Sequence, residues 1–185
     1  MENVLARARE LLQARGDSLA APACRVIDAV TALWREVQGD EAARLTLSDS
    51  THHEIACDVL EIGTGLATAT RLLLFFGGAF ETTRGVPDVS IASAIAEARQ
   101  WLSSSQPVHP WWAAVHTHLT QLANGFEALE MSIAKDIEIF VEGDALLNAA
   151  SYRRATEALQ RVAPSIPKLA RTINVVSLHA PPEQS

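Results

Sequence analysis

The feature that most constrains the fold is an unbroken apolar periodicity between residues 110 and 142. Its apolar residues recur at steps of three and four, as on one face of an α-helix. About thirty residues at 1.5 Å each make a helix about 45 Å long, close to the full width of a domain of this size. The pattern therefore predicts one helix that spans the domain. Its apolar face consists of Val115, Leu119, Leu122, Phe126, Leu129, Ile133, Ile137 and Phe140.

Shorter helical patterns fill most of the remaining chain, and glycines or prolines separate them. Gly16, Gly39, Gly77 and Gly143 each follow an amphipathic segment, as is usual at a helix C-terminus. Residues 40–47 are expected to add at most a short helical turn, and no alternating strand pattern occurs. The sequence thus predicts an all-α fold, a single-domain bundle of six or seven helices over residues 1–176, followed by a disordered tail at 177–185.

The segment 62–80, IGTGLATATRLLLFFGGAF, carries a single charge, Arg71, and is long enough to cross a membrane. Placing an arginine near the bilayer centre costs about 2.5 kcal/mol or more, which offsets the gain from its leucines and phenylalanines. The apolar residues of this segment are spread around nearly the whole circumference of the helix, which is typical of a helix in the middle of a bundle. We expect a central helix surrounded by protein and no stable membrane span.

Charge is distributed unevenly along a chain whose formal net charge is −7. This acidity argues against a nucleic-acid partner, because such binding needs a positive surface that releases counterions. The C-terminal 35 residues are locally basic, and we expect them to lie against acidic helices of the same molecule. The alternative is an exposed basic strip for an acidic partner. The basic residues concerned are Arg153, Arg154, Arg161, Lys168 and Arg171.

The two cysteines, Cys24 and Cys57, are too few for a disulfide framework or an unaided zinc site. The chain starts with a charged amphipathic pattern in place of an apolar signal segment. These features predict a cytoplasmic protein without a cofactor.

A cluster of potential metal ligands follows Thr51. His53 and Cys57 lie one helical turn apart, with Glu61 one turn further, so an ion or a His-activated thiol is one interpretation. The preferred interpretation is structural, because Thr51-x-x-Glu54 fits a capping box at a helix start. The acidic residues that follow, Asp58 and Glu61, would then form a solvated stripe.

Three tryptophans, Trp101, Trp111 and Trp112, flank the segment SSSQPVHP. Adjacent Trp111 and Trp112 point about 100° apart on a helix, so both are difficult to bury. Exposed tryptophans are enriched at protein interfaces, which makes this loop a candidate binding surface. A small satellite core under the loop is the slightly preferred interpretation, and the exposed binding surface is the alternative.

The second half of the long helix is strongly acidic. Glu127, Glu130 and Glu138 are candidate contacts for a basic partner or for the basic C-terminal helices. Glu127 and Glu130 are also close enough to act as an acid–base pair if a pocket enclosed them.

Gly63-Thr64-Gly65 lies inside a helical pattern and follows no strand, which argues against a phosphate-binding loop. Small residues at these positions instead predict close packing between helices.

These features favour a non-catalytic interaction protein that binds another protein through acidic helix faces and the tryptophan-bearing loop. A basic protein fits these faces best, and association with a second copy is an open alternative. A metal- or ligand-binding helical enzyme using His53, Cys57, Glu61, Glu127 and Glu130 is the second hypothesis. The third is a membrane-active bundle whose segment 62–80 inserts after a conformational change.

Overall fold

The computed structural model describes residues 1–39, 49–75, 90–104 and 110–179, and these ranges contain helices and no strand. The predicted all-α bundle is confirmed, and the long helix has the predicted bounds, Pro110–Glu142. In chain order the helices are α1 (Glu2–Arg15), α2 (Ala20–Gln38), α4 (Asp49–Leu74), α5 (Ile91–Ser104), α6 (Pro110–Glu142), α7 (Leu146–Val162) and α8 (Ser165–His179).

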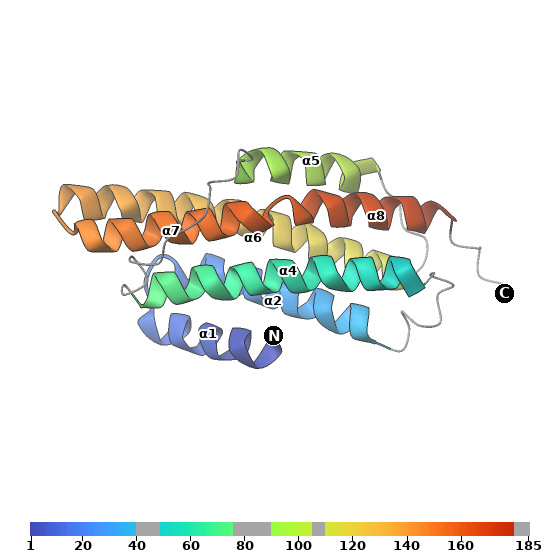
Figure 1. Cartoon of the computed structure of the whole chain (residues 1–185), viewed down its shortest axis with the longest axis horizontal. Coiled ribbons are helices and arrows are strands. Elements are labelled where there is room, and N and C mark those ends of the chain that lie inside the picture. Colours follow the sequence, from blue (N-terminus) through green and yellow to red (C-terminus); the bar gives the residue numbers. More distant parts are fainter. Residues whose placement is uncertain (40–48, 76–89, 105–109, 180–185) are drawn as a thin grey trace.

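The helices run roughly along one long axis (Figure 1). α2 packs most extensively on α6, α4 packs on α7 and α8, and α5 covers α8 and α6. α1 packs against α2 and α4 at the lower edge of the bundle (Figure 1). α6 and α7 form an antiparallel hairpin whose end projects beyond α1, α2 and α4 (Figure 1).

The core includes the predicted apolar face of α6 from Val115 to Ile133, and these residues are fully buried. Further along, Ile137 and Phe140 are only partly buried although the periodicity continues. This difference arises because the end of α6 projects beyond α1, α2 and α4 (Figure 1). The ring of Phe140 packs edge-on against Tyr152 of α7, with ring centroids 4.9 Å apart, so the two arms of the hairpin still share a contact.

Helix ends agree largely with the predicted signals. Gly16 ends α1 in the left-handed conformation (φ 67°), and its N–H donates to the carbonyl oxygen of Leu12 at 3.2 Å. Asp144 is also left-handed (φ 58°) in the turn between α6 and α7. α4 begins at Asp49, two residues before the predicted start at Thr51, and α8 continues to His179, into the predicted tail. Residues 40–47 and 180–185 lie outside the described residues.

The described helices include none that is long and apolar enough to cross a membrane. α4 ends at Leu74, so residues 76–80 of the proposed inserting segment lie outside the described residues.

Two glycines of α4 have different neighbours, and the predicted close packing between helices is confirmed at Gly65, where α7 lies against α4. A Cβ on Gly65 would come within 2.3 Å and 2.8 Å of the two Cγ atoms of Val162 on α7. A Cβ on Gly63 would instead meet the sulfur of Met1 at 2.1 Å. The difference is chemical, because the valine side chain is branched and buried whereas the methionine side chain is flexible.

Gly65→Ala is therefore expected to lower the free energy of unfolding by about 1–3 kcal/mol, since α4 and α7 must move apart. Gly63→Ala is the matched control. Met1 can rotate away, and alanine gains about 1 kcal/mol over glycine in helix propensity, so this variant should unfold at equal or higher denaturant concentration. Urea titration followed by circular dichroism compares the two, and equal losses would contradict the packing argument.

Candidate functional site

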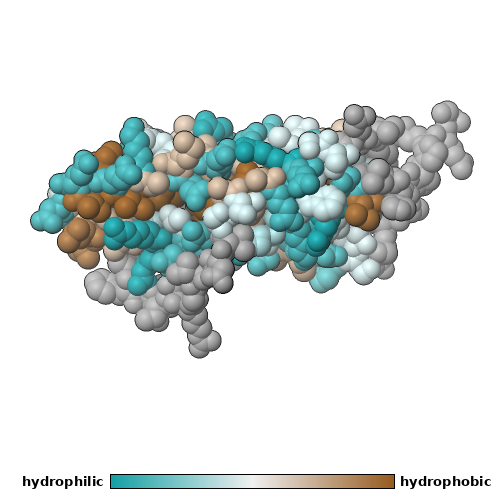
Figure 2. All heavy atoms as spheres, turned by 90° about the horizontal axis from the view of Figure 1, so that it is seen from above, coloured by the Kyte–Doolittle hydropathy of each residue, from teal (hydrophilic) through white to brown (hydrophobic). Residues whose placement is uncertain are grey.

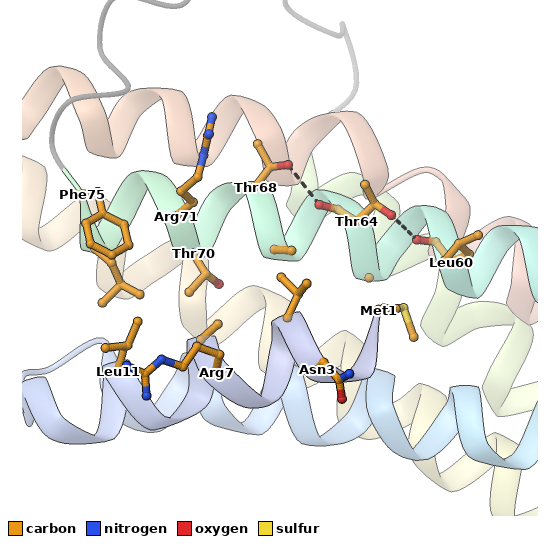
Figure 3. Close-up of a pocket in the computed structure, with 15 residues that line it drawn as sticks. Met1, Asn3, Arg7, Leu11, Leu60, Thr64, Thr68, Thr70, Arg71 and Phe75 are labelled. Atoms are coloured by element: carbon orange, nitrogen blue, oxygen red, sulfur yellow. Dashed lines mark hydrogen bonds between the residues drawn. The ribbon is translucent and has the colours of Figure 1, made fainter.

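A groove of about 870 Å³ lies between α1 and α4. Its two walls are regular helix faces, with contributing residues at steps of three and four on each helix. Phe75 lies at one end, and Met1 and Leu60 lie at the other (Figure 3). From Leu60 to Phe75 the α4 wall extends about 22 Å, or four helical turns. The α1 wall, from Asn3 to Leu11, extends about 12 Å, so the two walls lie side by side over the length of a short helix.

The walls of the groove are apolar and accessible to solvent. Val4, Leu60 and Phe75 expose 43–59% of their surface, and Leu11 and Leu74 are half-buried. Large side chains with this exposure lie together here on two adjacent helices, whereas scattered single exposures are ordinary on protein surfaces. The clustering marks the groove as the principal candidate for a binding surface.

Three threonines of α4 add to the apolar character despite their hydroxyl groups. Each hydroxyl donates to the carbonyl oxygen four residues earlier on the same helix: Thr64 to Leu60 at 2.8 Å, Thr68 to Thr64 at 3.0 Å and Thr70 to Leu66 at 2.8 Å. Two of these bonds are drawn in Figure 3. With the hydroxyls held by the backbone, the groove needs few polar groups from a bound molecule.

Arginines mark the edges of the groove. Arg7 comes from α1 and Arg71 from α4 (Figure 3). Arg7 donates to Glu10 at 2.8 Å, but both side chains are about two-thirds exposed, so the pair is screened by water. A second furrow of about 450 Å³ on the other side of α4 adds Arg161 and Glu61. The charges of Arg161 and Glu61 offset each other in this furrow, so Arg7 and Arg71 are the basic residues that line the larger groove.

The tryptophans lie elsewhere, and the burial of Trp111 and Trp112 agrees with the preferred satellite core and not with the alternative of an exposed pair. Trp111 is 5% exposed and Trp112 is 1% exposed. Their rings pack edge-on, with ring centroids 4.5 Å apart. The indole N–H of Trp111 donates to the carbonyl oxygen of Glu36 at 3.2 Å. Trp101 is half-buried against the same core. The side chains point in different directions, as expected, but α2 lies close enough to help bury them, and the satellite-core interpretation describes them better.

The acidic candidates on α6 have separate environments. Glu127 forms a two-pronged ion pair with Arg99 of α5, at 2.7 Å and 3.2 Å, and this pair lowers the pKa of Glu127. Burial raises the pKa of Glu130, and the charge of Glu127 adds to the effect. Neither carboxylate lines the groove. Glu138 is exposed near the end of α6.

The proposed metal ligands do not converge. His53 and Cys57 are exposed neighbours, with Nε2 and Sγ 3.5 Å apart. Glu61 instead accepts a hydrogen bond from Ser165 of α8 at 2.9 Å. Among the described residues, no group of three or more histidine, cysteine, aspartate or glutamate side chains is arranged to hold a metal ion.

The prediction that Asp58 belongs to a solvated stripe is wrong, because α8 covers it. Asp58 is 2% exposed and accepts a hydrogen bond from Lys168 at 2.8 Å. Glu54 lies 3.4 Å from the same ammonium group. Burial raises the pKa of Asp58, and the bond from Lys168 offsets only part of that effect. At this position, the expected pairing of the basic C-terminal helices with acidic helices is confirmed.

The groove was missed by sequence reasoning because its apolar residues were assigned to the core. Val4 and Leu11 belong to the same periodic pattern as Leu5, Ala8 and Leu12, but only the latter three are buried. Likewise, α4 was expected to be surrounded by protein, and the face that includes Leu60 and Phe75 is open. The available signal was the unusual width of the apolar face on both helices.

The fold and the groove define an all-α helical bundle with an open apolar surface. The chain matches no protein family model, no curated protein and no solved structure. Its function is therefore argued from this surface.

Proposed function

We propose that this protein is a non-catalytic protein–protein interaction module, and that the groove between α1 and α4 takes up an apolar helical segment of another polypeptide chain. The observation that carries the proposal is the pair of adjacent apolar walls, open to solvent along about four helical turns of α4 and little more than two of α1. Amphipathic helices commonly bind in grooves of this kind, with anchors at three- and four-residue steps.

The chemistry of the groove favours a polypeptide ligand over a small polar one. Its threonine hydroxyls are already bonded to the α4 backbone, so few groups are left to orient a polar substrate. A small-molecule site usually combines an enclosed apolar pocket with several convergent polar groups. Arg7 and Arg71 at the edges favour acidic side chains on the two borders of the bound helix.

A photo-crosslinking amino acid at Val4 tests the proposal in the native host. Val4 lines the groove and is 58% exposed, so the replacement is compatible with folding. We expect a covalent adduct with a second polypeptide. Adding Leu60→Gln should reduce its yield at least about tenfold, because burying a leucine side chain contributes about 1.5–3 kcal/mol.

The matched control carries the crosslinker at Val175, an exposed apolar residue of α8 outside the groove. Adducts specific to Val4 and sensitive to Leu60→Gln support the proposal. Adducts of equal yield from both positions, or none from Val4, would refute it. Because Leu60 is 43% exposed, Leu60→Gln should change the free energy of unfolding by no more than about 0.5 kcal/mol, which separates lost binding from unfolding.

A further inference from the structure

A second exposed apolar surface lies at the projecting end of the α6–α7 hairpin, here called the hairpin tip (residues 138–147). Figure 2 shows apolar residues gathered at this end of the molecule among hydrophilic ones. Four large apolar side chains of the tip expose between 44% and 65% of their surface: Ile139, Val141, Leu146 and Leu147. Exposing this much apolar surface on a projecting element is costly unless the surface is covered by another molecule.

The hairpin tip is acidic as well as apolar. It carries Glu138, Glu142 and Asp144, all exposed, and no basic residue. This charge disfavours an anionic lipid surface, and it disfavours contact between two tips because their carboxylates would repel. The surface that complements it is apolar with basic edges.

The groove between α1 and α4 has this complementary character. It is concave where the tip is convex, its walls are apolar, and its edges carry Arg7 and Arg71. The tip cannot reach the groove of its own molecule, because it projects beyond α1 and α4 (Figure 1) and is held there by the Phe140–Tyr152 contact. Contact between the two surfaces therefore requires two molecules.

We infer that the hairpin tip of one copy inserts into the α1–α4 groove of a second copy. This inference rests on the proposed function of the groove and names its occupant. The two surfaces are different, so the contact is head-to-tail, and it leaves one free tip and one free groove in every dimer. Association therefore continues beyond the dimer, into a ring if the rotation closes and into a filament if it does not.

Sedimentation velocity of the purified full-length chain over increasing concentration tests the inference. The wild type should form dimers and larger species. A tip variant, Leu146→Gln/Leu147→Gln, and a groove variant, Val4→Gln/Leu60→Gln, should each associate at least about tenfold more weakly. Association of the wild type should also weaken at high salt, because part of the attraction is between exposed charges.

Mixing the two variants provides the decisive measurement. The intact tip of the groove variant fits the intact groove of the tip variant, so the mixture should form 1:1 dimers and stop there. A symmetric interface between like surfaces would show no such rescue. Val175→Gln is the control, since Val175 is exposed on α8 in neither surface, and it should associate like the wild type.

A wild type that stays monomeric, or variants that fail to complement each other, would overturn the inference. The proposed function of the groove is tested separately from the self-association. Groove-specific adducts at Val4 with a different protein, alongside a monomeric chain, would retain the proposed function and remove only the self-association. Absence of any adduct at Val4 together with a monomeric chain would remove both.

Discussion

Trp112→Ala should lower the free energy of unfolding by about 3–5 kcal/mol, among the largest losses expected for a single substitution in this chain. Trp112 is fully buried and its ring packs edge-on against Trp111, so truncation leaves a cavity that rigid helices fill poorly. Denaturant titration should show a clear shift of the midpoint without loss of cooperativity.

Trp112→Phe is the informative control. Among the described residues, the indole nitrogen of Trp112 is buried without a hydrogen-bond partner, so phenylalanine removes an unsatisfied donor while keeping most of the apolar volume. It should cost much less than alanine. If Trp112→Ala instead left stability unchanged and impaired the binding of another chain, the interface role first considered for this residue would be restored.

Lys168→Met should lower the free energy of unfolding by about 3 kcal/mol at neutral pH, because it leaves the buried carboxylate of Asp58 without its charged donor. Among the described residues, the second oxygen of Asp58 has no hydrogen-bond partner, so the carboxylate has little other compensation. Glu54 and Glu61 add like charge nearby and oppose ionisation further.

The stability lost in Lys168→Met should depend on pH in a direction that identifies the buried carboxylate as its cause. Burial raises the pKa of Asp58, so the folded state holds this proton more tightly than the unfolded state does. Stability from this group is therefore greatest at low pH and is lost as pH rises from about 4 through the folded pKa. Removing Lys168 raises that pKa further, so the loss in Lys168→Met should shrink when the pH falls from 7 to about 5.

Asp58→Asn combined with Lys168→Met is the matched control, because the neutral amide cannot ionise. Its stability difference from the wild type should not carry the extra pH dependence seen in Lys168→Met. A loss in Lys168→Met that is equal at both pH values would show that the apolar stem of Lys168 matters and that the buried charge does not.

For much of the candidate site, the sequence predicted that the residues lie on helices but not that they are exposed to solvent. Leu60, Thr64 and Arg71 were correctly placed on one helix by periodicity. Their exposure was not predictable, because it depends on where α1 and α7 lie against α4. The tryptophans illustrate the opposite case, since the sequence left their exposure open and neighbours distant in sequence bury Trp111 and Trp112.

Local sequence was enough to specify the helices of this protein. The three- and four-residue recurrence of apolar residues defined α6 from end to end, and Gly16 ended α1 through a conformation that glycine adopts without strain. These properties depend on residues within a turn or two of each other. Packing between distant segments decided the rest: it buried Asp58 beneath Lys168, left Val4 facing a groove, and let the α6–α7 hairpin project beyond its neighbours. A helical pattern records which side chains share a face, but whether that face meets protein or water depends on the lengths and positions of other helices.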